Sequence, residues 1–431
     1  MVQTSVINDL LNAIGDTGLF GERRRRRIGR EEVSALIAAL LTGRGEASST
    51  ERAAEVLATY RDLDGAGRTF VFRTLLADYG PDTTALTTAA ERYLAEPGHS
   101  TAKALQRAAL PQRVEFFRRI NNVQGGTQAL VAMRCELMDR MAHHPDLWVV
   151  DDDLKRLLIA WFNRGFLTLR AIDWQTSAAV LEKIIRYESV HAINGWDDLR
   201  RRIDVPDRKL FGFFHPRLGD EPLIFVEVAL TTQTPRAIGP ILSGERTPIR
   251  PEEATTAVFY SINNCQEGLR GISLGNFLIK QVVADLTRDY PNLKTFVTLS
   301  PVPTFRAWLE GPEAPLTDET RATPEASLAP LAAHYLTAVK DARGRPLDPV
   351  ARFHLGNGAT LAQINPGADG SARGLAASHG LMVNYRYALS DIEANHEAFV
   401  NGGAVSAAPA IAKLARSVRP SPDAAPLPAP V

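Results

Sequence analysis

The sequence predicts two structured parts of different fold class. The first is an all-helical bundle over residues 1–172, and the second is an α+β domain with a mixed β-sheet and flanking helices over residues 173–416. Apolar residues of the first part recur every three or four positions, as they do on one face of an amphipathic helix. In the second part, runs rich in β-branched and aromatic residues alternate with turns and helices, which indicates a sheet. The alternation of Pro and Ala that follows predicts a disordered tail over residues 417–431.

The helical part carries signals for the starts and ends of its helices. Ser48-x-x-Glu51 has the spacing of a capping box, and the run from Asp151 to Asp153 places carboxylates where a helix dipole favours them. Glycine-containing breaks divide the pattern into about eight helices, which predicts a bundle. Amphipathic helices on this scale must bury their apolar faces, so we expect this part to mediate self-association as a homo-dimer or homo-tetramer.

A strand, loop, helix and strand over residues 255–300 form the most informative stretch of the second part. The first strand is followed by a loop with three glycines, and the second strand ends at Ser300-Pro301. A glycine-rich turn before a helix can bind an anion, because the first helical turn has unpaired N–H groups and the positive end of the dipole. Further strands are predicted over residues 210–214, 223–230 and 380–387.

The spacing of this glycine loop is neither the Walker pattern nor the dinucleotide fingerprint G-x-G-x-x-G. It is nearer the Q/R-x-x-G-x-G/A loop with which acetyltransferase-like folds hold the pyrophosphate of coenzyme A. Gln266 and Gly271 fit that pattern, whereas Leu269 replaces its first glycine. The alternative is that the glycines only turn a strand into a helix, so the loop by itself leaves coenzyme A binding open.

The composition favours a globular protein in a reducing compartment. The chain has 431 residues and equal numbers of acidic and basic side chains, so its bulk charge does not support a nucleic-acid or membrane-surface partner. The basic run from Arg23 to Arg27 could serve a nucleic-acid or targeting role, but its flanking glutamates favour a solvated helix face or a subunit contact. No uncharged apolar run approaches the roughly 18 residues that span a bilayer. Residues 1–30 have no apolar signal core and contain acidic residues, so we do not expect secretion. Cys135 and Cys265 provide neither a disulfide framework nor a metal cluster, so we expect no metal and a cytoplasmic location.

Four segments carry a resemblance to a known family. They are, in order, FYSINNCQEGLRGISLGNFLIKQVV, TLSPVPTFRAWL, RFHLGNGATLAQIN and GLMVNYRY. The Ser-Pro at a strand end, the H-L-x-N-G-A run and N-Y-R-Y together resemble the malonyl-CoA decarboxylase family, and the resemblance covers essentially the whole chain. It implies a helical domain involved in oligomerisation, followed by an acetyltransferase-like catalytic domain. It also implies the conversion of malonyl-CoA to acetyl-CoA and carbon dioxide without a cofactor.

The same resemblance implies site residues. The family's serine of S-P-x-P falls on Ser300, its histidine of H-L-x-N-G-A on His354, and the last tyrosine of N-Y-R-Y on Tyr387. The family's loop for the thioester carrier matches the run Arg270, Gly271, Ile272, Ser273, Leu274, Gly275 and Asn276. Animal members commonly have a glutamate where this chain has Ser273, so a role of that carboxylate does not carry over. The absence of their Ser-Lys-Leu ending and of a mitochondrial presequence favours a bacterial-type cytoplasmic enzyme.

The chemistry of this decarboxylation fits these residue types. Loss of carbon dioxide from malonyl-CoA leaves an enolate for which the thioester carbonyl is the electron sink, so no metal or pyridoxal cofactor is required. Backbone N–H groups can stabilise the enolate oxygen. His354 can supply the proton, because its unperturbed pKa is about 6.5. Ser300 is expected to bond the carboxylate or the thioester oxygen, or to relay a proton with His354, while Tyr387 orients one of the two. An acyl-serine is less favoured, because no Gly-x-Ser-x-Gly elbow surrounds Ser300.

Two other functions stay open at this point. An acyl-CoA-dependent N-acyltransferase of the same fold would account for the glycine loop but not for the helical part or for HLGNGA. A non-enzymatic scaffold could bind an acyl-CoA as a sensor. Taken alone, Ser300 is typical of a turn residue and His354 of a structural residue at a helix start; the matched order of the motifs is what favours catalysis.

Overall fold

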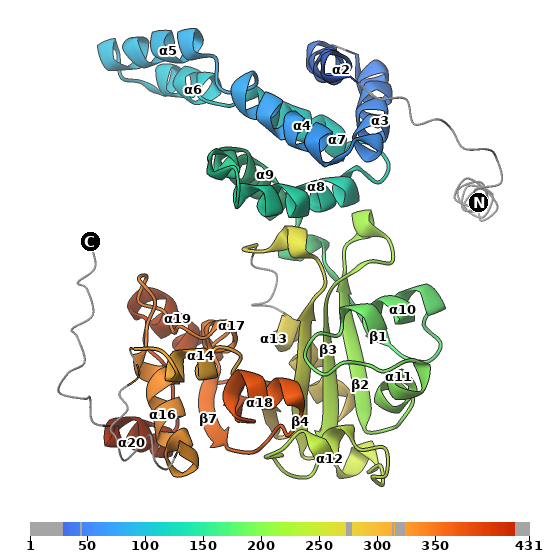
Figure 1. Cartoon of the computed structure of the whole chain (residues 1–431), viewed down its shortest axis with the longest axis vertical. Coiled ribbons are helices and arrows are strands. Elements are labelled where there is room, and N and C mark those ends of the chain that lie inside the picture. Colours follow the sequence, from blue (N-terminus) through green and yellow to red (C-terminus); the bar gives the residue numbers. More distant parts are fainter. Residues whose placement is uncertain (1–28, 44, 273–277, 313, 315–323, 419–431) are drawn as a thin grey trace. The chain divides into compact units, whose positions relative to one another are not determined.

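The computed structural model describes residues 29–43, 45–272, 278–312, 314 and 324–418 (Figure 1). The chain divides into two compact units, Met1–Leu157 and Leu158–Val431. The predicted order of a helical part and then a mixed sheet with flanking helices is confirmed. The basic run at Arg23 and residues 419–431 of the predicted tail lie outside the described residues.

The described part of the first unit is helical and is built around buried aromatic side chains, among them Phe72, Phe116 and Phe117. Its α-helices are α2 (Arg30–Thr42), α3 (Glu46–Asp62), α4 (Gly65–Ala77), α5 (Thr83–Ala95), α6 (His99–Ala108), α7 (Gln112–Asn121), α8 (Gly126–Met141) and α9 (Trp148–Trp161), of which α9 continues into the second unit. The predicted capping box is wrong. Because α3 already starts at Glu46, Ser48 lies inside the helix, where its hydroxyl donates to the Gly45 carbonyl at 3.1 Å.

The acidic residues at the start of α9 have a second role besides complementing its dipole. Asp151 accepts a hydrogen bond from Arg134 of α8 at 2.8 Å, and Asp153 accepts one from Arg113 of α7 at 2.7 Å. Both arginines are buried, with side chains only 2% and 4% exposed. Because an unpaired buried charge is strongly destabilising, these two ion pairs fix the start of α9 against α7 and α8.

The second unit is organised on a single mixed β-sheet. Its strands are β1 (Thr168–Ile172), β2 (Arg208–Phe214), β3 (Pro222–Thr231), β4 (Thr256–Asn264), β5 (Thr295–Thr298), β6 (Ser300–Pro301), β7 (Thr360–Asn365) and β8 (Met382–Arg386). They lie in the order β1-β2-β3-β4-β5-β8-β6, and β7 also pairs with β8. The β4–β5 pair is parallel, whereas the other pairs are antiparallel.

The prediction that the helical part extends to residue 172 is wrong at its end. Residues Thr168–Ile172 form strand β1, which pairs with β2 and therefore belongs to the sheet, and the boundary between the units falls earlier, after Leu157. The sequence gives little sign of this edge strand, because it has only five residues and Ile172 is the only buried one.

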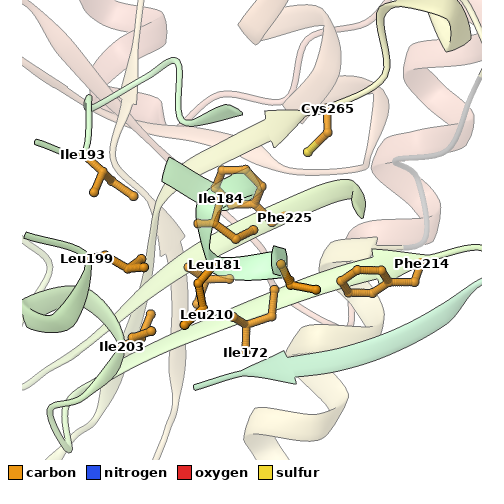
Figure 2. Packing of buried hydrophobic residues seen from close by; sticks show 11 residues of the cluster. Ile172, Leu181, Ile184, Ile193, Leu199, Ile203, Leu210, Phe214, Phe225 and Cys265 are labelled. Atoms are coloured by element: carbon orange, nitrogen blue, oxygen red, sulfur yellow. The ribbon is translucent and has the colours of Figure 1, made fainter. Parts of the chain in front are cut away.

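Helices α10 (Ala178–Tyr187) and α11 (Trp196–Ile203) pack on strands β1 to β3 (Figure 1). Figure 2 shows the apolar cluster that joins them, with Leu181 and Ile184 from α10, Leu199 from α11, and Leu210 and Phe225 from the sheet. Burial of each such side chain contributes about 1.5–3 kcal/mol. This cluster therefore fixes both helices, and with them the segment that joins α10 to α11.

The remaining α-helices of the second unit lie between its strands in the chain or after the last one. They are α12 (Gly239–Leu242), α13 (Leu278–Asp289), α14 (Phe305–Leu309), α16 (Pro324–Ala338), α17 (Pro349–Gly356), α18 (Ala372–Ser378), α19 (Ile392–Gly402) and α20 (Pro409–Ser417). Helix α13 joins β4 to β5, as the strand–loop–helix–strand pattern predicts. Within the described ranges, no helix is both long and apolar enough to cross a membrane.

Candidate active site

A cleft opens where the parallel strands β4 and β5 stop pairing. The ladder between them ends at Phe259 and Thr298, and the last bond runs from the Leu299 N–H to the Phe259 carbonyl at 3.0 Å. The cleft beyond this point has a volume of about 240 Å³. It is lined by the second half of β4, by β6, by α17 and by the segment before α11: Val190, Phe259, Tyr260, Ser261, Ile262, Asn264, Ser300, Pro301, Pro349, Val350, Phe353 and His354.

Ser300 lines this cleft and is the first residue of strand β6. Its backbone pairs with Val383 of β8, which fixes the direction of its side chain. The Ser300 hydroxyl donates to Thr298 Oγ1 at 2.8 Å and lies 3.1 Å from His354 Nε2. The interpretation of Ser300 as a mere turn residue therefore fails, because its buried hydroxyl contacts an imidazole inside a cleft.

His354 is held on both of its ring nitrogens and on one of its faces. Its Nδ1 lies 2.9 Å from the Tyr387 hydroxyl, opposite the contact with Ser300, and its ring stacks on Tyr385 with the ring centroids 4.7 Å apart. Burial lowers the pKa of His354 to about 3. The imidazole is therefore neutral near pH 7, because water and opposite charges are both kept away from it.

Helix α17, which carries His354, is fixed at both of its ends. At the start, the Asp348 carboxylate accepts the N–H groups of Val350 and Ala351, both at 2.9 Å. At the end, the Gly358 N–H bonds the Leu355 carbonyl, and the next N–H along the chain bonds the His354 carbonyl. This is the Schellman arrangement, in which a residue with positive φ closes a helix. The H-L-x-N-G-A run is thus the last turn and the C-cap of α17, and His354 lies in that turn rather than at a helix start.

Gly358 is required for this closure on two grounds. Its φ is +80°, and a Cβ at this position would lie 2.0 Å from the Ile392 carbonyl oxygen. We expect Gly358→Ala to lower the free energy of unfolding by about 2–5 kcal/mol, as the sum of left-handed strain and overpacking. Urea unfolding monitored by circular dichroism measures the change.

Gly344 provides a matched control for this substitution. Its φ is +73°, and a Cβ there would meet no atom within 4 Å. Gly344→Ala should therefore cost only the strain, about 1–2 kcal/mol. Equal losses in the two variants would contradict the overpacking argument.

The structure thus brings Ser300, His354 and Tyr387, which are distant in sequence, into one hydrogen-bonded chain. It describes only the start of the predicted thioester-carrier loop. Gly271 has a φ of +75°, Ile272 is buried, and Arg270 forms an ion pair with Glu267. The other predicted members, Ser273, Leu274, Gly275 and Asn276, lie outside the described residues, so the anion site stays a prediction. Among the residues that the structure describes, no group of three or more His, Cys, Asp or Glu side chains could hold a metal.

Two residues of the site were not predicted. Thr298 accepts from both the Ser300 hydroxyl and the Tyr385 N–H, and Tyr385 stacks on the His354 ring. Both lie two positions before a predicted residue, Thr298 before Ser300 and Tyr385 before Tyr387. Side chains two apart in a strand share a face, so the strand period was the signal that could have found them.

This geometry defines a class of protein before any relative is considered. The sheet opens between its parallel strands, and the opening holds a buried Ser–His–Tyr chain, an arrangement suited to acid–base chemistry. Family profiles narrow the class. The profile of the malonyl-CoA decarboxylase C-terminal domain matches residues 165–323 and 310–424, and that of the N-terminal domain matches residues 79–162. The chain therefore belongs to the malonyl-CoA decarboxylase family, a family of carboxy-lyases.

Individual relatives agree with this membership. The mitochondrial malonyl-CoA decarboxylase of Anser anser anser is 34% identical over 406 residues, with 81% of this chain and 80% of that protein covered. The crystal structure of malonyl-CoA decarboxylase from Rhodopseudomonas palustris is 51% identical, with a TM-score of 0.86, and covers 89% of this chain and 99% of that one. The corresponding structure from Agrobacterium vitis is 48% identical with a TM-score of 0.84 and the same coverage.

Proposed function

We propose that this protein decarboxylates malonyl-CoA to acetyl-CoA and carbon dioxide. The observation that carries the proposal is the buried chain from Tyr387 through His354 to Ser300, which ends in the cleft beside β4. A cleft at the carboxyl ends of parallel strands is where α/β sheets bind ligands. The names and the identity of the relatives support the same substrate. We further propose that the Arg270–Asn276 run holds the coenzyme A pyrophosphate.

The hydrogen bonds favour one arrangement of protons along this chain. Because the Ser300 hydroxyl donates to Thr298, the His354 Nε2 is left to donate to Ser300 Oγ, and Nδ1 then accepts from the Tyr387 hydroxyl. Burial raises the pKa of Tyr387 well above its usual range, so its hydroxyl keeps the proton that it donates. Tyr387 would therefore hold the imidazole in the tautomer that points its N–H at Ser300.

In the proposed reaction, the C–C bond to the carboxylate breaks and its electrons move onto the thioester oxygen as an enolate. Backbone N–H groups of β4 beyond Phe259, where the ladder to β5 has ended, would stabilise that oxygen. The negative charge of the substrate next to His354 raises the pKa of the imidazole and so permits it to take up a proton from solvent. His354 would then pass a proton to the α-carbon, directly or through the Ser300 hydroxyl, and the enolate becomes acetyl-CoA.

The test is incubation of the purified protein with malonyl-CoA alone, with chromatography to follow the thioesters. Acetyl-CoA should form in the absence of any acceptor, metal or added cofactor. A strict requirement for an amine acceptor would instead favour the N-acyltransferase of the same fold. Binding of malonyl-CoA without turnover would favour the acyl-CoA-binding scaffold. We also propose a cytoplasmic location, because the two free cysteines suit a reducing compartment.

We propose further that the chain forms a homo-oligomer, dimer or tetramer, through its helical unit. Helix α6 has no buried residue and α5 has one, Ala89, while Leu94 at the end of α5 is 78% exposed. Covering such apolar surface favours association. Size-exclusion chromatography with light scattering should give a particle of at least about twice the chain mass of 47.1 kDa. A particle of a single chain mass would contradict this prediction.

A further inference from the structure

A buried carboxylate, Glu188, lies behind the wall of the cleft. It caps the C-terminus of α10 and is only 7% exposed. Its Oε1 accepts the N–H groups of Val190 and His191, both at 2.7 Å. Its Oε2 accepts from the Ser261 hydroxyl and from the Asn263 side-chain amide of β4, also both at 2.7 Å. Four donors on two oxygens satisfy a carboxylate, which has no hydrogen of its own to donate when ionised.

Asn263 of β4 also forms hydrogen bonds to the segment that joins α10 to α11. Its Oδ1 accepts the N–H of Ser189 at 2.9 Å and the Ser189 hydroxyl at 2.8 Å, while its amide nitrogen donates to Glu188 and to Ser261. Arg202 of α11 donates to the His191 and Ala192 carbonyls at 2.8 and 3.0 Å. The segment from Ser189 to Ala192 is thus bound to β4 on one side and to α11 on the other.

The apolar cluster of Figure 2 fixes the helices on either side of this segment. Ile184 on α10 and Ile193 just before α11 both belong to that cluster. The ends of the segment are therefore held by apolar packing, and its middle is held by the Glu188 and Asn263 hydrogen bonds. Val190 and Ser261, which these bonds position, line the cleft together with Ser300 and His354.

We infer that Glu188 is a positioning residue that holds Val190 and Ser261 in the cleft wall and thereby sets the space available to a substituent on the α-carbon of the malonyl thioester. This inference rests on the proposed function. A residue that merely stabilised the fold would change the amount of active protein. A residue that positions the wall would also change which substrates fit.

The test compares malonyl-CoA with its 2-methyl analogue, methylmalonyl-CoA. A displacement of about 1 Å in an active site can cost about 10²-fold in rate, so we expect Glu188→Gln to lower kcat/KM for malonyl-CoA by about 10- to 100-fold. The decisive readout is the ratio of kcat/KM for methylmalonyl-CoA to that for malonyl-CoA, because it does not depend on the active fraction. This ratio should rise at least about threefold, since a loosened wall admits the extra methyl group. A pocket that excludes one such group typically discriminates between two substrates by about 10- to 200-fold in kcat/KM.

The Glu188→Gln/Asn263→Asp double variant tests the hydrogen-bond logic directly. In Glu188→Gln the new amide N–H group faces the Asn263 amide, donor against donor. In the double variant, the introduced aspartate accepts from that new amide and still accepts from Ser189, and the glutamine oxygen still accepts from Val190 and His191. Activity and the substrate ratio should return to within about threefold of the wild type, since the donors and acceptors are matched again. Glu182→Gln, an exposed carboxylate on the same helix, is the matched control and should change neither.

The outcomes separate this inference from the proposed function. If the wild type converts malonyl-CoA and Glu188→Gln leaves the substrate ratio unchanged, the positioning role is overturned while the proposed function stands. If the wild type has no such activity, both are overturned. Should Glu188→Gln fail to fold, Val190→Ala replaces it as the test, because this substitution only removes volume from the cleft wall. If the inference holds, Val190→Ala must raise the ratio of kcat/KM for methylmalonyl-CoA to that for malonyl-CoA.

Discussion

Replacement of His354 by glutamine is expected to lower kcat for malonyl-CoA by about 10²–10⁴-fold, the range that a general acid contributes. Glutamine is long enough to keep a hydrogen bond toward Ser300 Oγ, which His354 Nε2 contacts at 3.1 Å, so the fold should survive. It has no ionisable group, however, and cannot take up and release the proton that the α-carbon needs. Measurement of acetyl-CoA formation under saturating malonyl-CoA gives kcat directly. His99→Gln, at an exposed position on α6, is the control and should have wild-type kcat.

The same variant tests the electrostatic environment of His354. Burial lowers its pKa to about 3, below the value of about 6.5 in an unfolded chain. The unfolded state therefore binds the proton more readily, and this residue makes stability fall as the pH drops from about 6.5 toward 3. His354→Gln should lose less unfolding free energy than the wild type over the range from about pH 6.5 to about pH 4.5. An identical acid dependence in both proteins, or a kcat within about threefold of the wild type, would contradict the role proposed for His354.

The fold was predictable because its signals are local, whereas Ser300, His354 and Tyr387 were implied by the resemblance of their motifs to the family. Runs of β-branched and aromatic residues predicted the strands that end at Ser300-Pro301 and at the N-Y-R-Y run, and the structure has β5, β6 and β8 there. The H-L-x-N-G-A run encodes a helix end, since Gly358 supplies the positive φ that closes α17 beside His354. Such features depend on neighbours in sequence, and the order of the motifs then indicated that they act together.

The remaining parts depend on contacts that the sequence does not announce. The residue pattern predicts helix where strand β1 lies and does not predict β7, because both strands are short and neither shows regular alternation of buried and exposed positions. Glu188 gives no local signal at all. Val190 and His191 supply two of the four hydrogen bonds that it accepts. The other two come from Ser261 and Asn263 of β4, more than seventy positions away. Only the folded chain brings these groups around one carboxylate, so its role follows from tertiary structure alone.

Replacement of Ser300 by alanine is expected to lower kcat/KM for malonyl-CoA by about 10²–10⁴-fold, the range for a positioned group that takes part in proton transfer, because the hydroxyl relays the proton from His354. The hydroxyl is the group that joins the His354 imidazole to Thr298, at 3.1 and 2.8 Å, so its loss also leaves the imidazole N–H without its acceptor. A buried donor left unpaired costs about 1–3 kcal/mol. The rate and the unfolding free energy should therefore fall together.

Ser378→Ala separates these two effects. Ser378 is a buried serine of α18 whose hydroxyl donates to the Leu381 carbonyl at 2.8 Å, and it is not part of the cleft lining. Its substitution should cost comparable stability with little change in kcat/KM.

Calorimetric titration of Ser300→Ala with acetyl-CoA should still show binding, because the proposed carrier loop is untouched. Turnover lost with binding retained identifies an enzyme and excludes the acyl-CoA sensor. Full turnover by Ser300→Ala would remove the hydroxyl from the mechanism, and His354 would then have to deliver the proton directly to the α-carbon.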